Sequence, residues 1–144
     1  MQSLTLLNRS KDNQPIVLVA EDDEDNLLYI SSAFDLFGYH CISTQDPSVC
    51  LSLVQIYQPD LIILDVKLPD LTGVNLVRQL KFDPTTRKIP VIAATTMARA
   101  EEKEFILDAG FDNYLLKPFF LENLEQMVCS YLTQQFATAG KITA

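Results

Sequence analysis

Short apolar runs that end in a polar residue constrain the fold of this chain more than any other feature. The clearest run is Leu61–Leu64, whose large apolar residues are followed directly by Asp65. A run with no polar alternation is typical of a strand buried on both faces, as in a parallel sheet. The segments Ile16–Ala20 and Pro90–Ala94 have the same character. Together, these runs predict a parallel sheet whose two faces are covered.

Amphipathic segments separate the apolar runs. After the first run, apolar residues recur at three- and four-residue steps up to Phe37, and Gly38 suits a left-handed helix end. A second helix is expected from Pro47 to just before Pro59, and further helices at about 74–80, 100–109 and 121–132. Shorter strands are expected at 40–44 and 113–116. Alternation of five strands with five helices predicts an α/β fold: a doubly wound, flavodoxin-like (βα)5 parallel sheet with strand order 2-1-3-4-5.

The length and charge of the chain restrict its class. With 144 residues it is long enough for one domain with a proper core. We expect that domain at 15–133, between a flexible arm at 1–14, polar after a weak Leu4–Leu7 cluster, and a flexible tail at 134–144. The net charge of -8 argues against a nucleic-acid-binding surface, which needs a basic patch to neutralise phosphates.

Membrane insertion and secretion are not expected. No apolar run approaches the roughly 18–20 residues of a transmembrane span, and the first residues lack the basic start and apolar stretch of a signal peptide. The cysteines Cys41, Cys50 and Cys129 are scattered, with neither metal-site spacing nor a disulfide framework. These features predict a location in the reducing cytoplasm.

Polar residues stand at the carboxyl ends of four predicted strands. The first strand delivers Glu21 and Asp22, the third Asp65, the fourth Thr95 and the fifth Lys117. In open parallel α/β sheets, ligands bind outside the carboxyl ends of the strands. With the predicted order, the switch point falls between the two strands that end in acids. These residues therefore form the candidate site.

Converging carboxylates favour a hard divalent cation. Mg²⁺ prefers oxygen ligands and usually binds one or two carboxylates, waters and the phosphate oxygens of a substrate. An aspartate carboxylate such as Asp65 can accept a phosphoryl group as a nucleophile, and the metal would neutralise the charge of the transfer. Flavin binding on the same fold is disfavoured, because five acids from Glu21 to Asp25 would repel a bare phosphate.

At this point the chain resembles the receiver domain of two-component response regulators, over about 15–132. The resemblance rests on short motifs in a fixed order: Val17–Asp22, Leu64–Asp70 with Gly73, Pro90–Thr95, Ala109–Gly110 and Tyr114–Phe119. Each motif alone is weak, whereas the ordered set is highly specific.

The resemblance implies a role for each acid. Asp65 matches the phosphoacceptor, Asp22 a direct Mg²⁺ ligand, and Glu21 a residue that acts on Mg²⁺ through water. Lys67 matches the position whose backbone carbonyl binds the metal. No motif residue is missing, so the resemblance implies a receiver that can be phosphorylated.

The resemblance also implies a switch. Thr95 matches the hydroxyl that bonds the phosphoryl group, although a one-residue slip would put Thr96 there. Lys117 matches the lysine that pairs with the phosphoryl group. The peptide bond between Lys117 and Pro118 matches the cis peptide bond of the family. Tyr114 matches the aromatic residue that turns inward on phosphorylation.

The expected function is a phosphoacceptor response regulator that catalyses only its own phosphorylation and dephosphorylation. Its partners would be a sensor histidine kinase or phosphotransfer protein, and a downstream protein target or a second copy of itself. The resemblance places this contact on the fourth helix, fifth strand and fifth helix, where Phe105, Phe120 and Tyr131 lie. Two alternatives stay open: a Mg²⁺-dependent phosphohydrolase with an aspartate nucleophile, and an interaction module independent of phosphorylation.

Overall fold

A single parallel sheet forms the centre of the molecule. The computed structural model describes residues 14–66, 72–96 and 99–143. Its strands are β1 (Ile16–Ala20), β2 (His40–Thr44), β3 (Leu61–Asp65), β4 (Val91–Thr95) and β5 (Asn113–Leu116). They lie in the order β2-β1-β3-β4-β5, as predicted, and every neighbouring pair is parallel.

The register brings the carboxyl ends of the strands to one edge. In the centre of the sheet, Val19 lies beside Ile63, which lies beside Ile92. The last residue of β3, Asp65, pairs with Ala94, and Thr95 at the end of β4 pairs with Leu116. Because all strands run the same way, the polar residues that follow them gather at this edge.

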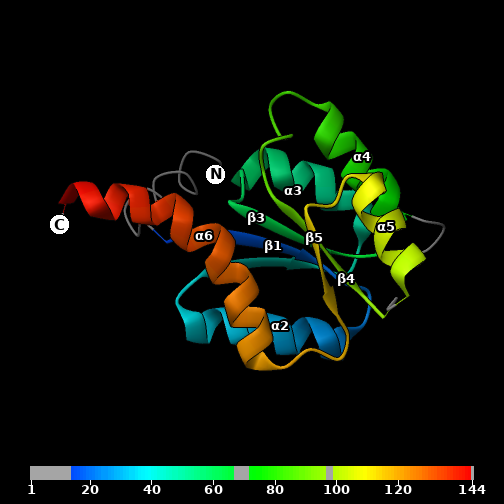
Figure 1. Ribbon diagram of the computed structural model, residues 1–144, viewed down its shortest axis with the longest axis horizontal. Helices are drawn as coiled ribbons and strands as arrows, with labels where there is room; N and C mark the ends of the chain where they lie inside the picture. The colour runs from blue at the N-terminus through cyan, green and yellow to red at the C-terminus, as the bar shows by residue number, and fades with distance from the viewer. Residues whose placement is uncertain (1–13, 67–71, 97–98, 144) are drawn as a thin grey trace.

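Helices cover both faces of the sheet (Figure 1). On one side lie α2 and α6, and on the other lie α3, α4 and α5. A short 3₁₀ turn, η1, precedes α3. Their bounds are α2 (Glu24–Phe37), η1 (Pro47–Val49), α3 (Cys50–Tyr57), α4 (Thr72–Phe82), α5 (Ala100–Ala109) and α6 (Leu121–Thr143).

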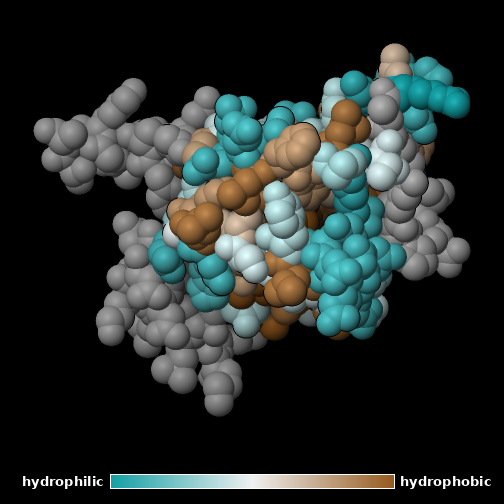
Figure 2. All heavy atoms as spheres, turned by 90° about the horizontal axis from the view of Figure 1, so that it is seen from below, coloured by the Kyte–Doolittle hydropathy of each residue, from teal (hydrophilic) through white to brown (hydrophobic). Residues whose placement is uncertain are grey.

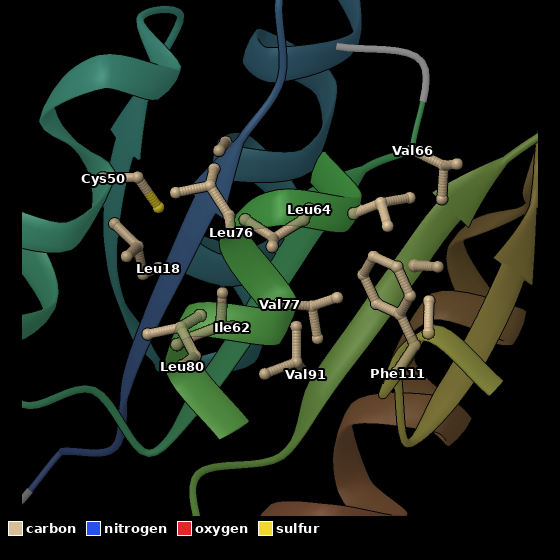
Figure 3. Close-up of a cluster of buried hydrophobic side chains, with 14 of the residues drawn as sticks. Leu18, Cys50, Ile62, Leu64, Val66, Leu76, Val77, Leu80, Val91 and Phe111 are labelled. Carbon is tan, nitrogen blue, oxygen red and sulfur yellow. The ribbon is translucent and has the colours of Figure 1, made fainter. Parts of the chain in front are cut away.

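The alternation of side chains along the strands builds two cores. Leu18 and Ile62 face the α3–α4–α5 side, where they pack with Val77 and Phe111 (Figure 3). Their strand neighbours face the α2–α6 side and pack with Phe34 and other residues of those helices. Three strands, β1, β3 and β4, are buried along their whole length. The apolar runs of the sequence therefore predicted these strands correctly.

The helix ends follow the local signals of the sequence. Gly38 ends α2 in the left-handed region, with φ 87°, where a glycine has no Cβ to clash. Asp46 caps the turn that leads into α3, and its side chain accepts a hydrogen bond from the backbone of Ser48. Pro47 occupies the first position of that turn, as expected.

Two helices are longer than predicted. α6 continues to Thr143, past the predicted end near Leu132, and its C-terminal turns run beyond the sheet (Figure 1). α4 spans Thr72–Phe82 rather than the predicted 74–80. Residues 1–13 of the predicted arm lie outside the described residues, and the flexibility of the tail stays a prediction. In the part of the chain that the structure describes, no helix is long and apolar enough to cross a membrane.

Candidate functional site

The candidate site lies at the carboxyl edge of β1, β3, β4 and β5. Asp65 is the last residue of β3, and only 4% of its surface is exposed. Glu21 follows β1 directly and is 1% exposed, whereas its neighbour Asp22 is exposed. Two buried carboxylates therefore lie beneath one that reaches solvent.

Lys117 joins the two buried acids. Its Nζ lies 2.6 Å from Oε1 of Glu21 and 3.1 Å from Oδ2 of Asp65, donating a hydrogen bond to each. One ammonium group thus offsets part of the charge of two carboxylates that are largely removed from water. Such charge-assisted bonds are shorter and stronger than neutral ones. This bridge fixes the geometry at the centre of the site.

The three acids are close enough to share one cation. One carboxylate oxygen each from Glu21, Asp22 and Asp65 lie within 4.8 Å of one another. Carboxylate oxygens in this number are the ligands that a hard divalent ion such as Mg²⁺ takes. The exposed Asp22 leaves the cluster open to solvent, which suits an ion that keeps several waters. These residues therefore fit Mg²⁺.

Burial and proximity shift the protonation of this cluster. Desolvation raises the pKa of Glu21 from 4.5 to about 7; the hydrogen bond from Lys117 opposes this rise and the neighbouring Asp65 adds to it. Burial also lowers the pKa of Lys117, but the carboxylates of Glu21 and Asp65 outweigh that effect and raise it above its ordinary value. Keeping Glu21 charged is consequently costly when no metal is present.

The turn after β1 holds the acidic pair in place. The backbone N–H of Glu21 donates to the carbonyl of Thr44 on β2, 3.1 Å away. The backbone N–H of Asp23 donates to Oε2 of Glu21, and the side chain of Asp23 caps α2 by accepting from Asn26. The sequence showed five acids from Glu21 to Asp25, but it did not identify Asp23 as the cap of α2.

Thr95 and Tyr114 occupy adjacent strands beside the acids. Thr95 ends β4 and is fully buried, whereas Thr96 is exposed, so Thr95 is the hydroxyl that belongs to the sheet edge. The backbone N–H of Lys117 donates to the carbonyl of Thr95, 2.7 Å away, which ties the ends of β4 and β5 together. Tyr114 is half-buried, and Nζ of Lys103 lies 5.2 Å from the centre of its ring.

A close backbone contact brings α4 against Asp65. A Cβ built on Gly73 would lie 2.6 Å from the backbone carbonyl oxygen of Asp65. Real Cβ atoms do not approach backbone this closely, so only glycine fits here. The sequence showed a glycine at this position within a motif, but not the contact that requires it.

The structure thus brings Glu21, Asp22, Asp65 and Lys117 together. It places Thr95 at the same edge of the sheet. The peptide bond between Lys117 and Pro118 is cis, as predicted. Lys67, whose backbone carbonyl was predicted to bind the metal, lies outside the described residues.

The fold and the site define a doubly wound α/β protein with a carboxylate–lysine centre at the carboxyl edge of its sheet. The family model of the response regulator receiver domain matches residues 17–129, and the chain belongs to this family. Receiver domains of this family bind Mg²⁺ in their active site. The sequence prediction of the family and its fold is therefore confirmed.

Individual relatives resemble the chain over most of its length. The polar-differentiation response regulators DivK of Brucella anthropi and Brucella ovis are each 34% identical over 116 residues, which cover 81% of this chain and 94% of each relative. Among solved structures, the chemotaxis response regulator CheY4 of Vibrio cholerae is 25% identical with a TM-score of 0.77, over 82% of this chain and 98% of that one.

One similar structure contains a metal. The receiver domain of the sensor histidine kinase PA1611 from Pseudomonas aeruginosa PAO1 has a magnesium ion coordinated in its active-site cleft. It is 27% identical to this chain, with a TM-score of 0.76, over 83% of this chain and 98% of that one.

Proposed function

We propose that this receiver domain accepts a phosphoryl group on Asp65 and that the modification switches a protein-binding surface. The observation that carries the proposal is the position of Lys117, whose Nζ contacts both Asp65 and Glu21. The lysine brings a cation to the oxygen that would receive the phosphoryl group. Of the two carboxylates that Lys117 contacts, Asp65 ends β3 and is the one that matches the phosphoacceptor by resemblance.

The reaction is an in-line displacement at phosphorus. A carboxylate oxygen of Asp65 forms a bond to the phosphorus of the donor, and the bond from phosphorus to the leaving group breaks. The leaving group takes the electron pair; when the donor is a phosphohistidine, it is an imidazole nitrogen. Lys117 is positioned to neutralise negative charge on the transferred phosphoryl oxygens.

The acids would hold the metal. Asp22 and Asp65 are placed to bind Mg²⁺ directly, Glu21 to bind it through water, and by resemblance the backbone carbonyl of Lys67 completes the set. The bound ion supplies charge neutralisation for the phosphoryl oxygens. The chain's own part is to hold these carboxylates at one edge of a rigid sheet.

Thr95 and Tyr114 are proposed to transmit the modification. The hydroxyl of Thr95 would bond the phosphoryl group, and Tyr114 on the next strand would move with it. The output surface is then the face of α5, β5 and α6, where Phe105 and Phe120 are exposed, by 43% and 70% of their surfaces. Tyr131, also expected in this region, is half-buried and packs against the α2–α6 core. A hollow of about 330 Å³ beside β5 and the start of α6 offers a place for an apolar side chain of the target.

The proposed partners follow from this role. A sensor histidine kinase or a phosphotransfer protein would supply the phosphoryl group in the cytoplasm. A downstream protein, or a second copy of the chain bound through the same face, would read the result. The chain would have no turnover on other substrates, only formation and loss of its own aspartyl phosphate.

Phosphorylation by a small donor tests the proposal. The chain is incubated with Mg²⁺ and acetyl phosphate, and its intact mass is measured. One labile phosphoryl group is expected on the wild type and on Asp108→Asn, a control aspartate exposed on α5. No adduct is expected on Asp65→Asn or in the presence of a chelator.

Other outcomes would support the alternatives. Release of many phosphate groups per chain from phosphate esters would indicate a phosphohydrolase. Absence of any adduct with every donor tried, in a folded chain that binds Mg²⁺, would indicate an interaction module that works without phosphorylation. Either result would overturn the proposal.

A further inference from the structure

The outer surface of α2 carries large apolar side chains that face away from the core. Leu28 and Leu36 are 64% and 74% exposed, although both are leucines of a helix that already buries another face. With Tyr29 and Leu121 they line a groove of about 400 Å³ between α2 and the start of α6. Figure 2 views the molecule from this side and shows apolar side chains gathered over the middle of the face. We call this groove and its lining residues the α2 groove.

The chain enters the described part of the structure beside one end of this groove. The side-chain amide of Gln14 donates to the carbonyl of Gly38, which ends α2. The carbonyl of Pro15 accepts from His40, just after the same helix end. The described part of the chain therefore begins beside the end of α2 at which Leu36 is exposed.

The residues that precede Gln14 have the composition that the groove needs. Leu4, Leu6 and Leu7 form the apolar cluster of the arm, followed by the basic residues Arg9 and Lys11. The helix α2 contains three acids and no basic residue. We propose that the arm folds back along α2, with its leucine cluster in the α2 groove and its basic residues near the acids of the helix.

The arm is long enough for this path. From Gly38 back to Leu28 is ten residues of helix, or about 15 Å at the helical rise per residue. Leu7 precedes Gln14 by seven residues, which reach up to about 23 Å when extended. An extended arm can thus bring the leucine cluster over the part of the groove that Leu28 and Leu36 line.

An arm bound in the α2 groove would lie next to the proposed phosphorylation site. Tyr29 lines the α2 groove and also a second hollow of about 340 Å³, which Lys117 and Phe119 line as well. This cover by the arm does not depend on the proposed function, because it rests on the groove, the entry point and the composition of the arm.

A tryptophan probe tests the cover, since the chain contains no tryptophan. In Leu36→Trp, the arm should shield the indole, giving a blue-shifted emission and weak quenching by acrylamide. Adding Leu4→Gln, Leu6→Gln and Leu7→Gln should shift the emission to the red and raise quenching severalfold. The control is Phe82→Trp, at a position 88% exposed on α4 across the sheet, where the arm substitutions should change nothing.

Three results would overturn the proposal. Equal quenching of Leu36→Trp with and without the arm leucines would show that the arm does not lie there. Shielding that disappears on dilution would show that a second copy covers the groove. Strong quenching in the intact chain, with a circular dichroism spectrum of a folded protein, would leave the groove open for another protein.

Discussion

Nζ of Lys117 lies 2.6 Å from a carboxylate oxygen of Glu21, although 96 positions separate the two residues in the sequence. The same ammonium group reaches Asp65. Glu21, Asp65 and Lys117 come from the ends of three different strands, so the sheet alone determines their distances. The consequences of this arrangement for stability, protonation and phosphorylation can each be measured.

Removing the lysine should destabilise the metal-free chain. In Lys117→Met the buried carboxylates of Glu21 and Asp65 lose the ammonium group that bridges them, so we expect the free energy of unfolding to fall by about 2 kcal/mol. Because Mg²⁺ binds only the folded cluster, it should restore part of this loss. Urea denaturation with chelator and with Mg²⁺ measures both effects.

A second lysine provides the control for that experiment. Nζ of Lys81 lies 2.8 Å from Asp112 in an ion pair outside the site. Lys81→Met should also lower the free energy of unfolding, but Mg²⁺ should not restore it. Equal rescue of both variants by Mg²⁺ would contradict the assignment of the metal to the acids beside Lys117.

The stability of the metal-free chain should depend on Glu21 between pH 4.5 and 7. Its pKa is raised from 4.5 to about 7 in the folded chain, so in this window the folded state holds a proton that the unfolded state has lost. The free energy of unfolding should therefore fall as the pH rises, by at most about 3 kcal/mol. Denaturation across this pH range in chelator measures the slope.

Substitution separates this slope from that of other acids. Glu21→Gln should remove it, because the amide does not titrate, whereas Glu24→Gln, an exposed residue on α2, should leave it unchanged. A slope that persists in Glu21→Gln would assign the titration to a different group.

Gly73 should be required for the position of Asp65. In Gly73→Ala the new Cβ would meet the carbonyl oxygen of Asp65 at 2.6 Å, so α4 or β3 must shift. We expect a loss of about 1–3 kcal/mol, typical of overpacking, together with slower phosphorylation by acetyl phosphate. Thermal unfolding and intact-mass time courses measure these two effects.

Gly38→Ala is the matched control for the glycine experiment. Gly38 has φ 87° and open space around its Cβ position, so alanine there strains the backbone at the end of α2 without touching the site. It should lower stability and leave the phosphorylation rate unchanged. A rate loss of the same size in both variants would mean that reduced stability, not the displacement of Asp65, slows the reaction.

Phosphorylation should change the contact between Lys103 and Tyr114. The ammonium group lies 5.2 Å from the centre of the ring, so the Lys103 side-chain protons should show ring-current shifts in NMR spectra, and Tyr114→Leu should abolish them. If Tyr114 moves with Thr95, acetyl phosphate should reduce these shifts while Mg²⁺ alone does not. Unchanged shifts on the phosphorylated chain would exclude Tyr114 as the moving aromatic.

The sequence predicted the sheet well because its strands are buried on both faces. Runs such as Leu61–Leu64 do not alternate between apolar and polar residues, and each ends where the chain leaves the core. Both the strands and the polar residues that follow them could therefore be predicted from the sequence. The end of α6 was not predicted: the residues after Gln134 are mostly small or polar, yet the helix continues to Thr143. Hydrophobic periodicity indicates where a helix packs, and it carries little information once the helix passes the sheet.

The residues of the site could be predicted from the sequence, but the contacts between them could not. Residue types and spacing identified Glu21, Asp22, Asp65 and Lys117 as candidates. Only the structure shows that Lys117 bridges two acids, since a distance between strand ends depends on the register and twist of the whole sheet. The same holds for the approach of Gly73 to Asp65.

Mapping the modified residue tests the central claim most directly. An aspartyl phosphate is an acyl phosphate, and borohydride reduces it to homoserine. After treatment with Mg²⁺ and acetyl phosphate, followed by borohydride, peptide mass spectrometry should find homoserine at position 65 alone, and none when a chelator replaces Mg²⁺. Homoserine at Asp22 or Asp23 instead, or none at any position of a phosphorylated chain, would contradict the assignment of Asp65 as the phosphoacceptor.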